Sequence, residues 1–198
     1  MEKQRNPRMI VFAGNNGSGK STLRHTLFEE LYTAVNIDPD LLAKKYAQGS
    51  NNATLLGGKE AIRMVNDCIQ RKVDFSLETT LSGKLIKRQI ESAKRNGFDV
   101  YMYFVGTNSV EINIERIKQR VLNGGHDIPE ETVRKRGERI VSNVVGCLGK
   151  IDYLRVVDST YKTMNTIFIS TRKELIKKTE YTPEWVTPIV KRIKDDKK

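Results

Sequence analysis

Residues 14–21 read Gly-Asn-Asn-Gly-Ser-Gly-Lys-Ser, which matches the phosphate-binding pattern G-x-x-x-x-G-K-[ST]. The apolar run 9–13 that precedes it has the length of a buried strand. After the pattern, Leu23, Leu27 and Leu31 recur at helical spacing. Strand, glycine-rich loop and helix in this order are the context that the pattern needs in order to bind phosphate. A chance glycine turn would not bring this context with it.

The loop predicts an ATP site. Glycines let the backbone wrap a phosphate chain without side-chain clashes, and successive N–H groups at the start of the helix point at the anion. We expect Lys20 to reach the β- and γ-phosphates and Ser21 Oγ to ligate Mg²⁺. The predicted ATP-binding residues are Gly14, Asn15, Asn16, Gly17, Ser18, Gly19, Lys20, Ser21 and Thr22.

Strand and helix patterns alternate along the rest of the chain. This alternation predicts an α/β fold with a mainly parallel sheet of five or six strands and helices on both faces, and the phosphate loop makes that fold P-loop kinase-like. Beyond 9–13, strands are predicted at 33–37, 73–77, 98–105, 153–157 and 165–170, and the main helices at 59–71, 82–96, 109–122 and 130–148, with Ser82 and Ser109 as caps.

The glycine- and asparagine-rich stretch 48–58 is predicted to be a loop. We divide the chain into a polar leader (1–8), a P-loop kinase domain (9–170) with a lid near 116–139, and a basic C-terminal tail (171–198). Three possibilities stay open for the tail, which carries Trp185: it packs on the core, binds a partner or lies loose.

Composition favours a soluble globular protein, with 38% hydrophobic and 30% charged residues in 198. No apolar run approaches the ~20 residues that span a bilayer, and the polar stretch 1–8 is unlike a signal peptide. We therefore expect a cytoplasmic location and no membrane partner.

Cys68 and Cys147 are expected to be buried thiols. The net charge of +11 suits either a polyanionic partner or a solvated surface, and the dispersed basic residues favour the surface.

Acidic residues follow two of the predicted strands, where ligands bind in such sheets. Asp40 is the predicted general base, which would take the proton of an acceptor hydroxyl. Asp38 is the alternative base or a group that supports Mg²⁺, and plain turn chemistry is the other interpretation of Asp-Pro-Asp. Glu78 could hold a metal-bound water or the acceptor hydroxyl, or could serve only as a helix-capping acid.

Arg116 and Arg120 are four residues apart and share one face of a predicted helix. That helix leads into a glycine-rich break, so both arginines are predicted to close over the triphosphate. Three arginines beyond the break are alternatives, and any of these side chains could simply be solvated. His126 is predicted to be a lid contact rather than a metal ligand, because no second His or Cys lies at ligand spacing. The three alternative arginines beyond the glycine-rich break are Arg134, Arg136 and Arg139.

Five segments together resemble the zeta toxin family of P-loop kinases: 17–24, 28–30, 37–40, 75–83 and 124–130. The resemblance runs from about Met9 to Thr160. It implies ATP- and Mg²⁺-dependent phosphorylation of a sugar hydroxyl, and in characterised zeta toxins the substrate is UDP-N-acetylglucosamine. It also makes a separate antitoxin protein a candidate partner.

By position, the resemblance implies that Asp40 is the base, Lys20 the phosphate lysine and Arg116 the first clamping arginine. The second clamping position falls on Arg120 or His126. Implied substrate contacts are Asp38, Glu60, Glu78 and Thr80, and Asp158 fits the loop that packs against adenine. The region between Asp40 and Glu60 differs from the family, and it should shape the acceptor pocket.

Two other functions stay open. A polynucleotide or nucleoside kinase would use the same loop and would suit the positive charge. A binding module controlled by ATP would bind the nucleotide without transferring phosphate to a small molecule.

Overall fold

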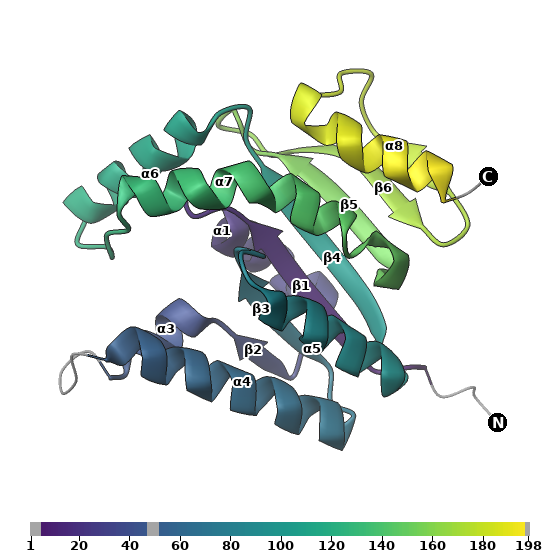
Figure 1. Ribbon diagram of the computed structural model, residues 1–198, viewed down its shortest axis with the longest axis horizontal. Helices are drawn as coiled ribbons and strands as arrows, with labels where there is room; N and C mark the ends of the chain where they lie inside the picture. The colour runs from purple at the N-terminus through teal and green to yellow at the C-terminus, as the bar shows by residue number, and fades with distance from the viewer. Residues whose placement is uncertain (1–4, 47–51, 197–198) are drawn as a thin grey trace.

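The computed structural model describes residues 5–46 and 52–196. A seven-stranded sheet lies at its centre, in the order β2-β3-β1-β4-β5-β6-β7. β2, β3, β1, β4 and β5 run parallel, and β6 and β7 are added antiparallel beside β5 (Figure 1). The bounds are β1 Arg8–Gly14, β2 Val35–Ile37, β3 Phe75–Thr79, β4 Asp99–Gly106, β5 Tyr153–Asp158, β6 Asn165–Thr171 and β7 Leu175–Lys177.

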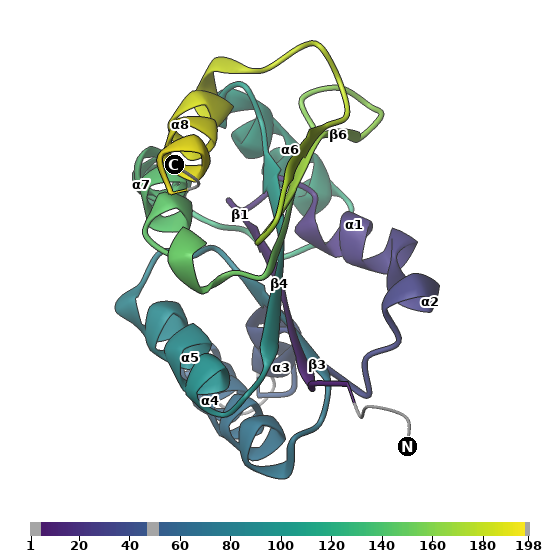
Figure 2. The ribbon, with the colours of Figure 1, turned by 90° about the vertical axis from the view of Figure 1, so that its right-hand side faces the viewer.

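Helices cover the two faces of the sheet unequally. α4, α5, α7 and α8 lie on one face, whereas α1 and α2 lie on the other (Figure 2). The bounds are α1 Lys20–Thr26, α2 Phe28–Leu31, α3 Pro39–Lys44, α4 Ala53–Arg71, α5 Lys84–Arg95, α6 Val110–Leu122, α7 Glu130–Val145 and α8 Thr187–Asp195, with 3-10 turns at η1 Leu148–Lys150 and η2 Glu184–Val186. The predicted fold class is confirmed. The sheet has seven strands instead of five or six because the three-residue β7 was too short to show a strand pattern.

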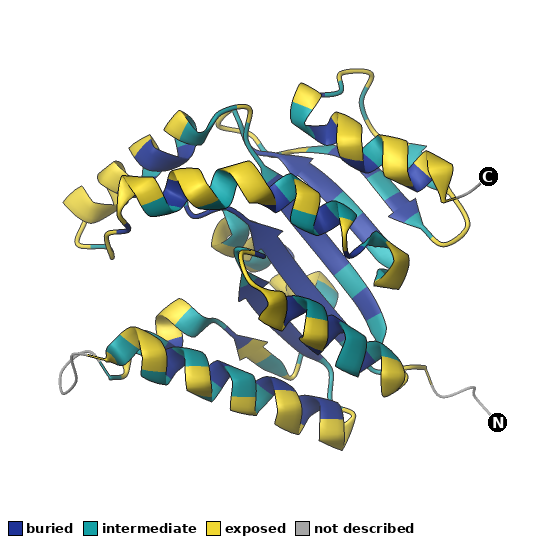
Figure 3. Ribbon diagram, in the orientation of Figure 1, coloured by how far each residue is buried: buried dark blue, intermediate teal, exposed yellow. Residues whose placement is uncertain are grey.

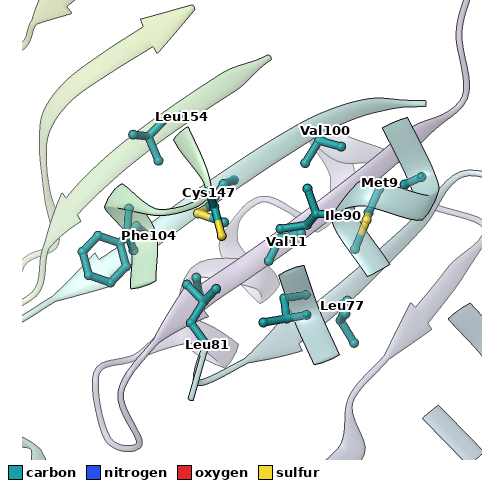
Figure 4. Close-up of a cluster of buried hydrophobic side chains, with 14 of the residues drawn as sticks. Met9, Val11, Leu77, Leu81, Ile90, Val100, Phe104, Cys147 and Leu154 are labelled. Atoms are coloured by element: carbon teal, nitrogen blue, oxygen red, sulfur yellow. The ribbon is translucent and has the colours of Figure 1, made fainter. Parts of the chain in front are cut away.

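The hydrophobic core lies on both faces of β1 and its neighbours. The side chains of Met9 and Val11 belong to the larger cluster beneath α4, α5, α7 and α8, and those of Ile10 and Phe12 pack beneath α1. Buried residues concentrate on the central strands in Figure 3. Figure 4 shows Cys147 within this core, and both cysteines are buried, as predicted. Burial raises the pKa of each thiol, so both favour the neutral form.

α4 begins at Ala53, so the predicted loop 48–58 is partly helical, while its residues 48–51 lie outside the described part of the chain. Gly57 lowers helix propensity, but it serves a packing purpose. A Cβ at this position would lie 2.4 Å from the Ala43 backbone nitrogen, so glycine lets α4 contact α3 closely. The long-range contact therefore outweighs the local preference for a loop.

Of the two predicted serine caps, Ser109 is in the N-cap position and Ser82 is not. Ser109 is the N-cap residue of α6, but its side chain makes no capping hydrogen bond. α5 is preceded by Gly83 instead of Ser82, and the Ser82 hydroxyl is paired with the Thr80 hydroxyl at 2.9 Å. Ser82 therefore belongs to the loop that leaves β3.

The C-terminal residues pack on the sheet. Val186, Ile189 and Ile193 are buried in the larger core cluster. The Trp185 ring meets Phe104 edge-on at 5.6 Å between centroids, and its Nε1–H donates to Asn108 Oδ1 at 3.2 Å. Of the three possibilities for the tail, the structure therefore selects packing on the core. Within residues 5–46 and 52–196, no helix is both long enough and apolar enough to cross a membrane.

Candidate active site

The glycine-rich loop connects β1 to α1 and has a conformation that requires glycine. Gly17 and Gly19 have φ angles of 75° and 92°, in the left-handed region that other residues rarely adopt. A Cβ on Gly17 would lie 2.4 Å from the Asn113 carbonyl oxygen. The backbone can therefore turn tightly here and direct its N–H groups towards the space above α1.

Side chains from distant parts of the chain hold this loop. Asn113 Nδ2 on α6 donates to the Asn16 carbonyl at 3.0 Å, and Asn15 Nδ2 donates to the Val133 carbonyl on α7 at 2.9 Å. After β5, the Ser159 hydroxyl donates to the Ser18 carbonyl at 2.6 Å. The loop is thus fixed in shape before any ligand binds, which lowers the entropy cost of binding.

A cleft of about 680 Å³ opens beside the loop. Most of the predicted site residues line it, although they come from several separate elements. Gly14, Asn15 and Ser18 are buried behind the loop and do not line the cleft. The predicted residues in its lining are Asn16, Gly17, Gly19, Lys20, Ser21, Thr22, Asp38, Asp40, Glu78, Thr80, Arg116, Arg120 and the lid residue His126.

Lys20 lies in the cleft as a cation without a carboxylate partner. Its Nζ donates to the Asn15 carbonyl at 2.9 Å, and no carboxylate of the described residues lies within ion-pair distance. Burial lowers the pKa of Lys20 to about 8, and the negative charges of Glu78, Asp40 and Asp38 oppose this shift. An anionic ligand would neutralise this charge and raise the pKa again.

Glu78 is buried and contacts two residues of α1. Its Oε2 accepts a hydrogen bond from Ser21 Oγ at 2.8 Å, and its Oε1 accepts one from Arg24 Nε at 2.6 Å. Both side chains of the Arg24–Glu78 ion pair are largely buried, with 12% and 7% of their surface exposed. Arg24 therefore fixes the orientation of the carboxylate, and the second oxygen faces the serine.

Ser21 and Glu78 are suited to Mg²⁺. The described residues contain no group of three or more His, Cys, Asp and Glu side chains that would form a complete protein cage. Mg²⁺ usually keeps several waters and takes one or two protein oxygens together with substrate phosphates. A hydroxyl and a carboxylate 2.8 Å apart at the phosphate loop fit that requirement.

The two aspartates that follow β2 differ in their contacts. Asp38 is the N-cap of α3, and its Oδ1 accepts from the Asp40 and Leu41 backbone N–H groups at 3.0 and 3.2 Å. The Asp40 carboxylate is exposed in the cleft and has no hydrogen-bond or ion-pair partner among the described residues. Asp38 thus shapes the turn, and Asp40 is free to meet a hydroxyl group.

Three arginines reach the cleft from the lid side. Arg116 donates to the Ser159 carbonyl at 2.5 Å and the Ser159 hydroxyl at 3.1 Å, and Arg120 donates to the His126 carbonyl at 2.5 Å. Arg136 on α7 donates to Asn16 Oδ1 at 2.6 Å and is the one that touches the phosphate loop. Its positive charge also contributes to the lowered pKa of Lys20.

In the sequence alone, Arg136 is only one of several arginines that could close over the triphosphate. It follows Val133 by three residues and precedes Ile140 by four, so it shares the inward face of α7 with two buried residues. Arg134 lies on another face, where it forms an exposed ion pair with Glu111 at 2.7 Å. The helical spacing of the buried residues was therefore the signal that separates these arginines.

Two further predicted site residues, Glu60 and Asp158, also lie outside the cleft lining. The Glu60 carboxylate accepts a hydrogen bond from the Tyr46 hydroxyl at 2.6 Å, between α3 and α4. Asp158, at the end of β5, accepts from the Thr160 backbone N–H at 2.9 Å and lines a neighbouring hollow. The structure therefore does not bring these two carboxylates together with Lys20 and Asp40.

A phosphate loop after β1, an interior strand of the sheet, with Lys20, Ser21 and Glu78 in one cleft, defines a P-loop kinase-like protein. The family model described as zeta toxin matches residues 1–174. The chain belongs to the zeta toxin family.

Known proteins that resemble this chain include an uncharacterised protein from Haemophilus influenzae. It is 41% identical over 130 residues, which cover 65% of this chain and 91% of that protein. Among solved structures, the PezAT toxin–antitoxin system of Streptococcus pneumoniae matches 98% of this chain and 88% of its own, with a TM-score of 0.59 and 16% identity.

The structure of AvrRxo1-ORF1:-ORF2 with ATP gives a TM-score of 0.71 at 15% identity and covers 95% of this chain. The match spans 64% of that chain, which is less than two thirds of the relative's length. At these identities the solved structures support the shared fold alone.

Proposed function

We propose that this protein is a kinase of the zeta toxin type, which transfers the γ-phosphate of ATP to a hydroxyl of a nucleotide sugar such as UDP-N-acetylglucosamine. The observation that carries the proposal is that Asp40, a carboxylate without a partner, lines the same cleft as Lys20. A base and a phosphate-binding cation in one cleft suit transfer between two ligands. The proposed acceptor class rests on the family, whose characterised toxins act on UDP-N-acetylglucosamine.

In this proposal, the loop N–H groups and Lys20 hold the phosphates of ATP. Ser21 and Glu78 hold Mg²⁺, which neutralises charge on the phosphates when it is bound. Arg116, Arg120 and Arg136 face the same space from the lid (116–139) and stabilise the charge of the transition state. Asp158 belongs to the loop beside the adenine.

Asp40 acts on the acceptor. Its carboxylate accepts a hydrogen bond from the acceptor hydroxyl and takes the proton as the new O–P bond forms and the bond to ADP breaks. Thr80, Asp38 and Glu60 are proposed to orient the acceptor, with Glu60 acting through a movement of α3 and α4. The proton leaves Asp40 to water after the product departs.

The test is phosphorus NMR of the protein with ATP, Mg²⁺ and UDP-N-acetylglucosamine. The native protein should produce a new phosphomonoester signal, and Asp40→Asn should lower the rate at least about 100-fold, the lower end of a general base's contribution. Glu29→Gln, an exposed change on α2, is the matched control and should leave the rate unchanged. Equal rates in the native protein and Asp40→Asn would exclude Asp40 as the base.

Lys20→Ala should abolish productive use of ATP, because the phosphates lose their cation. If ATP is consumed but no new ester forms, the phosphate site remains supported and UDP-N-acetylglucosamine is excluded as the acceptor. In that case other acceptors would be tested first among nucleic acid ends, which the net charge of +11 favours. Oligonucleotide binding that weakens steeply with salt would support that second candidate.

A separate antitoxin is the proposed protein partner, because the family match and the PezAT likeness point to toxin–antitoxin pairs. Expression of the native chain alone should then arrest growth, and Asp40→Asn should relieve the arrest. Normal growth with the native chain, together with measurable phosphotransfer, would indicate a metabolic kinase instead.

A further inference from the structure

The α4–α5 hollow, of about 570 Å³, lies between the first half of α4 and the first turn of α5. The two helices lie side by side over one face of the sheet (Figure 1). The lining of the hollow includes Leu55, Gly58, Lys59 and Ile62 from α4 and Leu85 from α5. Leu55 and Leu85 are 56% and 46% exposed, and Ile62 belongs to none of the core clusters of the described residues. Exposed apolar side chains that gather in one hollow are typical of a surface that a partner covers.

Gly58 keeps this hollow open. A Cβ at this position would meet no atom of the described residues within 4 Å, so close packing does not require a glycine here. Glycine inside a helix lowers stability by about 1 kcal/mol relative to alanine. Gly57 differs, because its missing side chain lets α3 approach on another side of α4. Gly58 therefore weakens the helix and leaves space that a side chain from outside the chain could fill.

Exposed cations lie on the helical turns that carry these apolar residues or on the next turn. Lys59 lines the hollow, Arg63 follows it by one turn of α4, and Arg88 follows Leu85 by one turn of α5. No carboxylate within residues 5–46 and 52–196 lies within ion-pair distance of any of these cations. The exposed cations are Lys59, Arg63, Lys84 and Arg88.

The acidic residues of α4 and α5 do not balance this charge. Glu91, the acid of α5, forms an ion pair with Lys150 at 2.6 Å, and Glu60 on α4 points towards the end of α3. Asp67 forms an ion pair with Arg71 in the second half of α4. The first turns of both helices contain no acidic residue, so the positive ends of the helix dipoles add to the potential there. The hollow is therefore apolar inside and positive at its rim.

The charge and the apolar surface together define the partner that fits. A second copy of this chain, with a net charge of +11, would bring cations against cations. A nucleic acid would pair with the cations but leave the leucines uncovered, because it binds through phosphate contacts and base stacking on aromatic rings. An acidic amphipathic helix satisfies both features, since its apolar face fills a groove and its carboxylates meet the cations.

We propose that the α4–α5 hollow is a docking site for an acidic amphipathic helix of a separate protein. An apolar side chain of that helix would lie over Gly58 between Leu55 and Leu85, and carboxylates on the adjoining turns would pair with Lys59 and Arg88. The residues that line the hollow are not among those that line the kinase cleft. The proposal therefore does not depend on the reaction proposed for the cleft.

The test is a selection from a phage-displayed library of helical peptides with randomised outer positions, with the native protein as bait. The enriched peptides should carry apolar residues at i, i+3 or i+4 and i+7, with Asp or Glu beside them. Fluorescence anisotropy of the labelled peptides then measures affinity. Gly58→Leu should weaken binding at least about tenfold because it fills the hollow, and it should not unfold α4, because leucine favours helix more than glycine does.

Leu85→Asp should weaken binding by a similar factor. Leu122→Asp is its matched control, because Leu122 is a 78% exposed leucine on α6, away from the hollow, and binding should not change. Circular dichroism checks that each variant is folded. Lys59→Glu combined with Arg88→Glu should also weaken binding, and a peptide with its acidic residues changed to lysine should regain affinity for this variant.

Four results would overturn the proposal. The first is that no peptide is enriched on the native protein above the level on Gly58→Leu. The second is that the enriched peptides lack acidic residues, and the third is that they bind the native protein and Leu85→Asp equally. The fourth is a dimer of the native chain in sedimentation that Leu85→Asp dissociates, which would assign the hollow to a second copy.

Discussion

Burial in the cleft disfavours the charged form of Lys20, which is the form that attracts phosphate. The cleft removes water from its ammonium group, and Glu78 and the two aspartates only partly offset the loss, so its pKa falls to about 8. The protonated form of Lys20 attracts phosphate, so the ATP-free protein above pH 8 must take up a proton in order to bind ATP.

ATP affinity should therefore decrease as the pH rises above about 8, by up to about tenfold per pH unit. Calorimetric titration with ATP in the absence of divalent cations, between pH 7 and pH 10, measures this. Lys20→Arg is the control, because a guanidinium stays charged throughout. A weaker but pH-independent affinity is expected for this variant, and a flat profile in the native protein would contradict the lowered pKa.

At the scale of elements, the contact between α3 and α4 positions Asp40. Gly57→Ala would place a methyl group 2.4 Å from the Ala43 backbone and force α3 to shift. We expect a loss of about 1–3 kcal/mol in the free energy of unfolding, together with slower phosphotransfer. Urea denaturation and the phosphorus NMR assay measure the two effects.

The neighbouring glycine provides the matched variant. A Cβ on Gly58 would meet nothing within 4 Å, so Gly58→Ala should stabilise the protein by up to about 1 kcal/mol through helix propensity. Equal effects of the two substitutions would mean that the close approach of α3 and α4 does not matter for stability.

The elements that the sequence predicted well are those with local signals. β1, the phosphate loop and α1 follow from apolar runs and glycines within a short stretch. The first turns of α4 could not be predicted, because Gly57 favours a loop locally. Its reason for being in a helix is the close contact with α3, which exists only in the folded chain. The hydrogen bond from Arg136 to Asn16 joins residues 120 positions apart. The spacing of buried residues could predict that Arg136 lies on the inward face of α7, but not that it contacts Asn16.

At the scale of the molecule, α8 completes the large core cluster that begins with β1. The sheet and its C-terminal cover should therefore unfold together, as small domains commonly do. Trp185, the single tryptophan, reports on the C-terminal part, whereas circular dichroism reports on all the helices.

Ile189→Ala should lower the free energy of unfolding by about 2–4 kcal/mol, because its side chain is fully buried. Urea curves from Trp185 fluorescence and from circular dichroism should coincide before and after the change. Lys191→Ala, on the exposed side of the same helix, should change stability by less than about 0.5 kcal/mol. A fluorescence transition at lower urea than the dichroism transition would show that the C-terminal part unfolds separately.

The contacts around the phosphate loop also bear on how the protein is made. The loop is encoded near the start of the chain, but the groups that hold it come from Asn113, Val133, Arg136 and Ser159. A ribosome produces these residues long after it has produced the loop. The growing chain therefore completes the support of its phosphate loop only after residue 159 has emerged, and translation itself delays the onset of the proposed activity.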